Sequence, residues 1–298
     1  MPDIQPQSQA STLFSQSYPL LFVGLWSTGF IGAKLGLPDA EPLTFLSLRY
    51  AIVLVLMGAI ALLTRAPWPR TARECWHIGV SGLLIHAVYL GGVFIAIRQG
   101  LPAGVTALVV GLQPVLTALG AGAWLGERVK PSQWLGLLLG FAGVSLVVAH
   151  KVAAGVSGAA LLGLLAPAVI ALLGITAGTL YQKRFCPAFD LRSGSVIQFL
   201  PSLLLTGLLA YLCESMQVHW SGNFIFALGW LVLVLSLGAV NLLNMLIRRG
   251  SAVHVASLFY LVPPTTAVFA WALFNETLSG LALLGMALAV FGVWLARR

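Results

Sequence analysis

The chain has 298 residues, of which 59% are hydrophobic and only 8% are charged. A soluble domain carries roughly 25% charged residues and a disordered chain has low hydrophobicity, so the composition excludes both classes. At about 20 apolar residues per transmembrane helix, the length has room for about ten helices joined by short loops. We therefore predict a polytopic membrane protein with no soluble domain.

Apolar runs between charged residues and Pro or Gly breaks predict ten helices in an all-α integral membrane fold. Residues 1–17 are polar and contain no Lys or Arg, unlike a secretory signal peptide, so we expect a loose N-terminal tail there. The predicted helices cover residues 18–37, 43–63, 76–97, 103–125, 133–149, 159–182, 194–213, 224–247, 252–274 and 278–296.

The basic residues are unevenly distributed between the two sides of the membrane. With a cytoplasmic N-terminus, 12 of the 16 Lys and Arg residues fall in inside segments, 3 fall at outside ends, and Arg49 lies within the second helix. Short loops rich in Lys and Arg stay in the cytoplasm. We therefore expect an inner-membrane protein with both termini cytoplasmic. The net charge of +8 then follows from topology, and no nucleic-acid partner is required.

The two halves of the chain match at an offset of 149 residues, mainly at rare Lys and Glu residues and at Pro and Gly. The matching pairs are Gly29 and Gly178, Lys34 and Lys183, Pro38 and Pro187, Pro114 and Pro263, Glu127 and Glu276, Gly136 and Gly285, and Gly143 and Gly292. Five helices per half is an odd number, so the second copy must be inverted relative to the first. Inverted repeats are typical of secondary transporters, whose substrate site lies near the midplane between the halves. We expect the repeats at residues 18–149 and 150–298.

Residues 111–127, GLQPVLTALGAGAWLGE, begin a pattern that continues with Trp134-Leu-Gly136 and Gly140-Phe-Ala-Gly143. A second copy runs from Leu261-Val-Pro263 to Asn275-Glu276. The ordered pair resembles the signature of the EamA family of the drug/metabolite transporter superfamily, and so do Trp26-Ser-Thr-Gly-Phe30 and Leu48-Arg49-Tyr50 in the first two helices.

The resemblance implies ten helices in two inverted five-helix repeats. It also implies a central cavity lined mainly by the first, third, fourth, sixth, eighth and ninth helices, and the export of amino acids or other small metabolites. The halves differ at one position of interest, because Gln198 stands where the first half has Arg49.

Polar side chains within membrane helices are costly and usually face the interior of the bundle. His86 and Tyr89 are three residues apart and share a helix face. His86 would bind a substrate carboxylate or carry a coupling proton; the alternative is a neutral imidazole that bonds to a neighbouring helix. Asn241 and Asn244 also share a face, and their amides suit either a polar substrate group or contacts between helices.

Gln113 precedes Pro114, which removes a backbone hydrogen bond and frees a carbonyl. Tyr260 lies three residues before Pro263 and is expected on the opposite wall. Arg49 requires a partner. The predicted substrate-binding residues are Trp26, Ser27, His86, Tyr89, Gln113, Asn241, Asn244 and Tyr260.

The absence of three sequence features argues against several classes of membrane protein. There is no GxxxxGK[ST] motif for ATP, no HExxH motif for zinc, and no Asp within a predicted helix, so we expect neither an ATP-driven pump nor an intramembrane enzyme, and no cofactor or metal. A secondary exporter of small molecules is expected, with drug efflux and metabolite uptake as alternatives. A channel or membrane scaffold is the alternative from a different class.

Overall fold

A computed structural model of the chain describes residues 9–101, 103–126, 130–152, 158–186, 188–274 and 280–296. Over these ranges every regular element is helical, and the only strand-like pairing is an isolated bridge between Ala40 and Val218. The elements are α1 (Gln9–Gly36), α2 (Pro42–Leu63), α3 (Ala72–Gly82), η1 (Leu83–Leu90), α4 (Gly91–Arg98), α5 (Ala103–Val110), α6 (Gln113–Gly120), η2 (Ala121–Leu125), α7 (Pro131–Val152), α8 (Gly158–Phe185), α9 (Leu191–Cys213), α10 (Gly222–Trp230), η3 (Leu231–Ala239), α11 (Val240–Arg249), α12 (Ala252–Ser257), η4 (Leu258–Leu261), α13 (Val262–Phe274) and α14 (Gly280–Ala296).

Seven of the helical segments are long and apolar enough to cross a membrane. They are Tyr18–Gly36, Pro42–Leu63, Ala72–Arg98, Gly163–Phe185, Leu191–Cys213, Gly222–Arg249 and Ala252–Leu273. The segments predicted at 103–125, 133–149 and 278–296 are helical where they are described, except for a turn at 111–112. They are not among the seven, so the count of ten spans stays a prediction.

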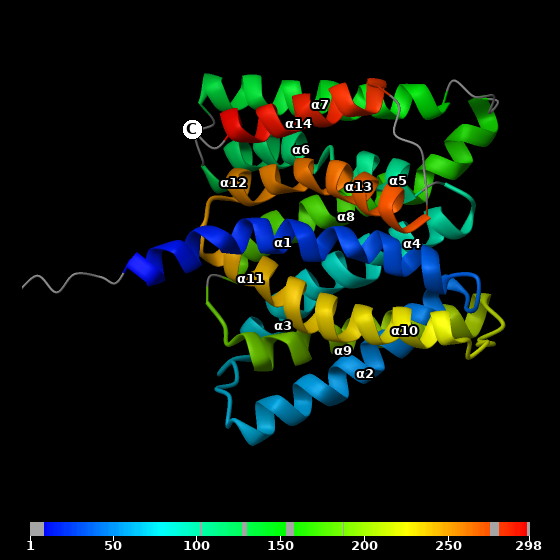
Figure 1. The fold of residues 1–298 in the computed structure, drawn as a ribbon. Coiled ribbons are helices and arrows are strands. Elements are labelled where there is room, and N and C mark those ends of the chain that lie inside the picture. The colour runs from blue at the N-terminus through cyan, green and yellow to red at the C-terminus, as the bar shows by residue number, and fades with distance from the viewer. Residues whose placement is uncertain are drawn as a thin grey trace, which may run out of the picture.

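The helices form one bundle in which the two halves of the chain interleave (Figure 1). α2 packs on α9, α7 packs on α14, and α1 lies between α13 and α10, so each pairing joins one element from each half. The tail expected at residues 1–17 is helical from Gln9 onward, and residues 1–8 lie outside the described ranges. No Gly or Pro interrupts residues 9–18, so the first helix extends back into this polar stretch.

The helix predicted at 103–125 is not continuous, which corrects the sequence-based expectation. α5 ends at Val110, a turn follows at Gly111-Leu112, and α6 begins at Gln113. Pro114 has no N–H and its ring clashes with the preceding turn of a helix, so the helix restarts there. The second half behaves similarly, because a 3₁₀ turn, η4, immediately precedes the Pro263-Pro264 pair.

Two π-helical segments occupy matching places in the two halves. η1 covers Leu83–Leu90, and adding the offset of 149 places its equivalent at residues 232–239, within η3 (Leu231–Ala239). π-helical turns are rare and often occur at functional sites. We therefore expect a functional site near η1 and η3.

Small residues allow η1 and α3 to approach their neighbours closely. A Cβ atom on Gly174 would lie 2.8 Å from Val88 Cγ1 and 2.9 Å from the Tyr89 backbone nitrogen, so the Gly174/Gly178 pair packs α8 directly against η1. A Cβ atom on Gly82 would overlap the backbone of Gln198 on α9. These contacts fix the position of Tyr89.

One end of the bundle is held by three carboxylates that bridge residues 39–44 and 214–221, which we call the acidic clasp. Glu214 accepts hydrogen bonds from the Leu43 and Thr44 backbone N–H groups at 2.8 and 2.7 Å, so it caps α2 from a distant segment. The other bonds of the clasp are Ser215 N and Oγ to Glu41, each at 2.6 Å, Ser221 Oγ to Asp39 at 2.6 Å, and His219 Nδ1 with Asp39 at 2.9 Å.

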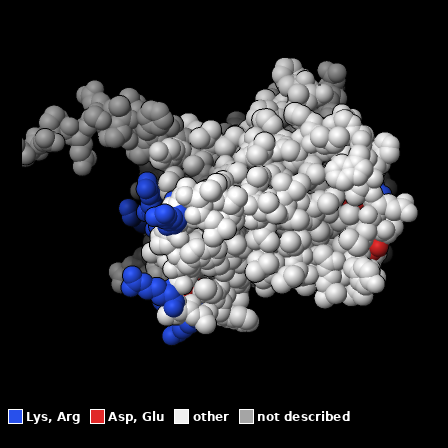
Figure 2. Space-filling model, turned by 90° about the horizontal axis from the view of Figure 1, so that it is seen from below, with Lys and Arg blue, Asp and Glu red and all other residues white. Residues whose placement is uncertain are grey.

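Hydrogen bonds hold two of these carboxylates in the charged form. The bonds from Ser221 and His219 lower the pKa of Asp39, and those from Ser215 lower the pKa of Glu41. Lys and Arg side chains gather mostly at the opposite end of the face in Figure 2. The face drawn in Figure 2 thus has an acidic end and a mainly basic end.

We predict that Gly82→Ala destabilises the protein, because the new methyl group must push α9 away from α3. Overpacking of this kind costs about 1–3 kcal/mol. The melting temperature of the purified protein in detergent should fall by several degrees. Gly58→Ala is the matched control, since no described atom lies within 4 Å of a Cβ at that position and Ala favours the helix. Equal melting temperatures for the two variants would contradict the packing described here.

Candidate functional site

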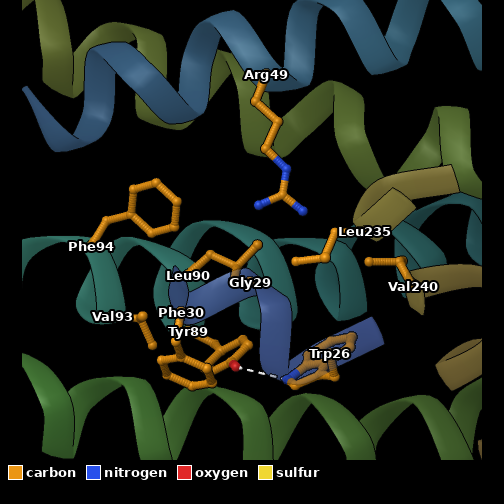
Figure 3. Close-up of a pocket in the computed structure, with 10 residues that line it drawn as sticks. All are labelled: Trp26, Gly29, Phe30, Arg49, Tyr89, Leu90, Val93, Phe94, Leu235 and Val240. Atoms are coloured by element: carbon orange, nitrogen blue, oxygen red, sulfur yellow. Dashed lines mark hydrogen bonds between the residues drawn. The ribbon is translucent and has the colours of Figure 1, made fainter. Parts of the chain in front are cut away.

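A narrow pocket lies between elements of both halves (Figure 3). Its wall is mostly apolar and aromatic and contains one charged side chain. The lining residues are Trp26, Gly29 and Phe30 of α1, Arg49 of α2, Tyr89 and Leu90 of η1, Val93 and Phe94 of α4, Leu235 of η3 and Val240 of α11. The two π-helical segments at matching places, η1 and η3, therefore both contribute to the pocket.

The Trp26 and Tyr89 side chains form one aromatic wall. Trp26 Nε1 donates a hydrogen bond to the Tyr89 hydroxyl at 3.1 Å, and the two rings are nearly parallel, at 8°, with centroids 6.1 Å apart. Phe259 packs edge-on against Trp26 from the second half, with centroids 5.5 Å apart. The bond satisfies the indole N–H in an apolar setting, so both rings are held in place.

Arg49 enters the pocket from α2 and is only 1% exposed. Its Nε donates to Ser236 Oγ at 2.9 Å, which ties α2 to η3 in the second half. Nη1 has no hydrogen-bond partner among the described residues, and the guanidinium points into the pocket (Figure 3). The pocket thus presents a buried cation opposite an aromatic wall.

Sequence reasoning did not place Arg49 in the site, and the cavity-lining helices implied by the resemblance did not include the second helix. A signal was available: Arg49 is a charged residue in the interior of a span, and the predicted spans contain no Asp. An ionisable residue inside a membrane is a candidate functional residue by default.

Of the eight predicted site residues, Trp26 and Tyr89 line the pocket and the other six do not. Ser27 is next to the wall, but its hydroxyl bonds to the Val23 and Val262 carbonyls at 2.7 and 3.3 Å. It therefore links α1 to α13 instead of facing the pocket.

His86 is fully buried beside the pocket. Its ring stacks on Phe199 at 4.1 Å and 14°, and neither ring nitrogen has a hydrogen-bond partner among the described residues. Its backbone carbonyl accepts a bond from the Tyr50 hydroxyl at 2.9 Å. His86 and Tyr89 lie on the same π-helical segment, yet only Tyr89 reaches the wall.

Asn244 belongs to a buried amide network that joins four elements. Gln182 Nε2 donates to Asn244 Oδ1 at 3.1 Å, and Asn244 Nδ2 donates to Gln198 Oε1 at 3.0 Å. Gln198 Nε2 in turn donates to Ser81 Oγ at 3.1 Å and to Gln182 Oε1 at 3.3 Å. This arrangement corresponds to the interhelical alternative for Asn244, and sequence reasoning had not included Gln182 in it.

The remaining predicted residues also bond to neighbouring groups. Asn241 Nδ2 donates to the Leu237 carbonyl at 2.9 Å, and its Oδ1 accepts a bond from Ser195 Oγ at 3.1 Å. Gln113 Nε2 donates to Thr179 Oγ1 at 3.2 Å, while its Oε1 has no partner among the described residues. The Tyr260 hydroxyl donates to the Leu137 carbonyl at 2.9 Å.

Comparison with known proteins identifies the family. A model of the EamA-like transporter family matches residues 16–149 and, a second time, residues 158–298. The chain belongs to the EamA-like transporter family. It is accordingly a membrane transporter and not an enzyme, and the resemblance noted from the sequence is confirmed.

Relatives of this EamA-like transporter are similar over most of their length. An uncharacterized transporter, YvbV of Bacillus subtilis, is 30% identical over 91% of this chain and 87% of its own. An uncharacterized inner membrane transporter, YedA of Escherichia coli, is 26% identical over 96% and 90%. A probable amino-acid metabolite efflux pump of Escherichia coli is 27% identical over 93% and 92%. A solved crystal structure with 22% identity covers 97% of both chains with a TM-score of 0.77, which shows a shared fold.

We predict that Asn244→Ala destabilises this EamA-like transporter more than Asn241→Ala does. Removing Asn244 leaves Gln182 Nε2 and Gln198 Oε1 each without a hydrogen-bond partner that they have in the wild type. Each unsatisfied buried group lowers the free energy of unfolding by about 1–3 kcal/mol. Removing Asn241 leaves the Ser195 hydroxyl with a hydrogen-bond partner, because Ser195 Oγ also bonds to the Leu191 carbonyl at 2.6 Å. Thermal unfolding of the purified variants measures the difference. An Asn244→Ala protein that melts like the wild type but loses transport would assign Asn244 to substrate binding instead.

Proposed function

We propose that this chain is a secondary transporter that exports small metabolites, such as amino acids, by alternating access of two inverted five-helix repeats, residues 18–149 and 150–298. The main support is that the pocket is lined by α1, α2, η1 and α4 from the first half and by η3 and α11 from the second. A site shared by two repeats can be exposed to either side when one repeat rocks against the other. Relatives in Escherichia coli and Salmonella typhimurium are named probable amino-acid metabolite efflux pumps, which supports the direction of transport.

Matching contacts in the two halves support equivalent repeats. Arg98, at the end of α4, donates to the Leu37 carbonyl at 2.9 Å, in the loop that joins α1 and α2. Arg248, at the end of α11, donates to the Phe189 carbonyl at 2.6 Å, in the loop that joins α8 and α9. The same kind of bond thus holds the corresponding loop in each half. α1 ends near the acidic clasp, whereas the last turn of α8 carries Lys183 and Arg184.

Drug efflux and metabolite uptake are the alternatives within the same class. A channel or scaffold is the alternative from a different class. Saturation with substrate and exchange of internal for external substrate would distinguish a carrier from a pore. His86 is not among the lining residues, so proton coupling through it is not part of this proposal.

We further propose an inner-membrane location with both termini in the cytoplasm. The support is the basic end of the bundle (Figure 2). Arg65 and Arg70 lie in the connection between α2 and α3, and Arg73 lies in the first turn of α3. Segments rich in Lys and Arg that flank membrane helices stay on the cytoplasmic side. The relative YedA is named an inner membrane transporter.

We predict that cells overexpressing the wild-type chain release a small set of amino acids or related metabolites into the medium. Comparative mass spectrometry of the medium measures this. Trp26→Ala removes part of the pocket wall and should abolish the release, whereas Trp271→Ala changes a 54% exposed side chain on the outside of the bundle and should not. Depletion of a metabolite from the medium would show uptake and contradict the proposed direction of transport. No change relative to an empty vector would contradict export of cellular metabolites.

We predict that Cys213 reacts with a membrane-impermeant maleimide in intact spheroplasts, whereas Cys75 reacts only after lysis. Cys213 is exposed and lies beside the acidic clasp, and Cys75 is at the start of α3, near the basic end. Each is tested in a protein whose other two cysteines are changed to Ser. Because Cys186 is buried, its replacement by Ser alone serves as the control for folding. The reverse labelling pattern would invert the orientation.

A further inference from the structure

We propose that Arg49 binds the carboxylate of the transported molecule, and that the pocket prefers an organic monoanion with an apolar or aromatic body to a zwitterionic amino acid. This rests on the proposed function as a small-molecule carrier, and it names the substrate class for the pocket. The inference comes from a buried cation, from the absence of a counter-ion for it among the described residues, and from the chemistry of the opposite wall.

The charge on Arg49 has no counter-ion among the described residues. The sequence has eight acidic residues, and Glu127, Glu276 and Asp3 lie outside the described ranges. The other five are engaged near helix ends: Asp39, Glu41 and Glu214 form the acidic clasp, Glu74 accepts from the Arg70 N–H at 2.9 Å, and Asp190 pairs with Arg192 at 2.7 Å. A cation buried without a partner is strongly unfavourable, so an anionic ligand would be stabilised there.

The guanidinium is also oriented for binding. The bond from Nε to Ser236 fixes one edge of the planar group. Nη1 has no partner among the described residues, and the guanidinium points into the pocket (Figure 3). Arginine binds carboxylates through N–H groups in a fixed planar arrangement, and holding the plane in advance lowers the entropic cost of binding. Arg49 therefore presents donors to a ligand without rearranging.

The rest of the wall fits an apolar body. Trp26, Phe30, Tyr89 and Phe94 supply aromatic surface, and the other lining residues are aliphatic or Gly. The Tyr89 hydroxyl accepts the Trp26 N–H, so the indole donor is already used. The lining residues include no carboxylate, and an ammonium group brought into the pocket would lose its hydration without gaining an anionic partner. A carboxylic acid without an amino group avoids that cost.

Three probes that share a phenyl group test this selectivity: 3-phenylpropanoate as the anion, phenylalanine as the zwitterion and 2-phenylethylamine as the cation. Binding to the purified full-length protein is measured by thermal stabilisation and titration calorimetry. We expect the anion to bind most tightly and the cation most weakly. Arg49→Gln should weaken anion binding about tenfold or more, as expected for the loss of a hydrogen bond to a charged group.

Two further variants test whether the positive charge or the planar donor arrangement of Arg49 is needed, and whether loss of an unrelated cation has any effect. Arg49→Lys keeps the positive charge but loses the planar arrangement of donors, so its anion affinity should fall between those of wild type and Arg49→Gln. Arg249→Gln changes an exposed cation at the end of α11 and should bind like the wild type. If Arg49→Gln fails to fold, the proposal is tested by the order of the affinities of the three probes for the wild-type protein.

Equal affinity of the wild type for the anion and the zwitterion would overturn the proposal, and so would full anion affinity in a folded Arg49→Gln protein. Counterflow in proteoliposomes distinguishes a failure of the substrate assignment from a failure of the proposed carrier function. Counterflow of amino acids with no preference for anions would remove only the substrate assignment. Binding of anions that depends on Arg49, with no counterflow of any probe, would support the anion site and remove the carrier function.

Discussion

Polar groups inside this bundle must find their partners within the protein, because hydrocarbon offers none. Most of them do so. Gln182, Gln198 and Asn244 satisfy one another across helices, and hydroxyls such as Ser202 and Thr206 bond to carbonyls of their own helix at 2.8 Å. The few buried polar atoms left without a partner among the described residues therefore stand out, and those of Arg49, His86 and Gln113 are among them. Arg49 alone of these three carries its unpartnered group into the pocket.

The two repeats share a scaffold but differ in chemistry at equivalent positions. Arg49 and Gln198 are related by the offset of 149 residues, and both are buried on the second helix of their repeat. In the first half the side chain reaches the pocket, and one of its donors has no partner in the part of the chain that the structure describes. In the second half a neutral amide closes a network with Ser81, Gln182 and Asn244. The two equivalent positions thus differ in role: Arg49 is the proposed ligand-binding position, and Gln198 is a packing position.

The sequence was sufficient to predict the helical membrane fold, the family and two pocket residues, Trp26 and Tyr89. These depend on apolar run length, on rare residues that repeat, and on aromatic side chains near the middle of a helix. The interruption at Gly111-Leu112 was not predicted, because Pro114 also occurs in continuous kinked helices and only the surrounding packing decides between the two outcomes.

The roles of the amides could not be predicted for a different reason. An Asn on a helix face has the same donors and acceptors whether it contacts substrate or a second helix. Only the positions of Gln182 and Gln198, from other helices, show that Asn244 is already engaged. Arg49 is the converse case, since its importance lies in a partner that is absent among the described residues, and helix periodicity does not reveal which neighbours a side chain meets.

The exposed part of the acidic clasp has a property that the proposed alternating access would require of a contact between halves. If the repeats rock about the pocket, the bonds between residues 39–44 and 214–221 must break and form again in each cycle. The states must differ by only a few kcal/mol for both to be populated. Contacts such as the Asp39–His219 pair, in which the His219 side chain is 80% exposed, contribute little net free energy, since water replaces them at small cost. The buried amide network would be far more costly to open, so movement at the acidic end is expected to break the clasp and leave that network intact.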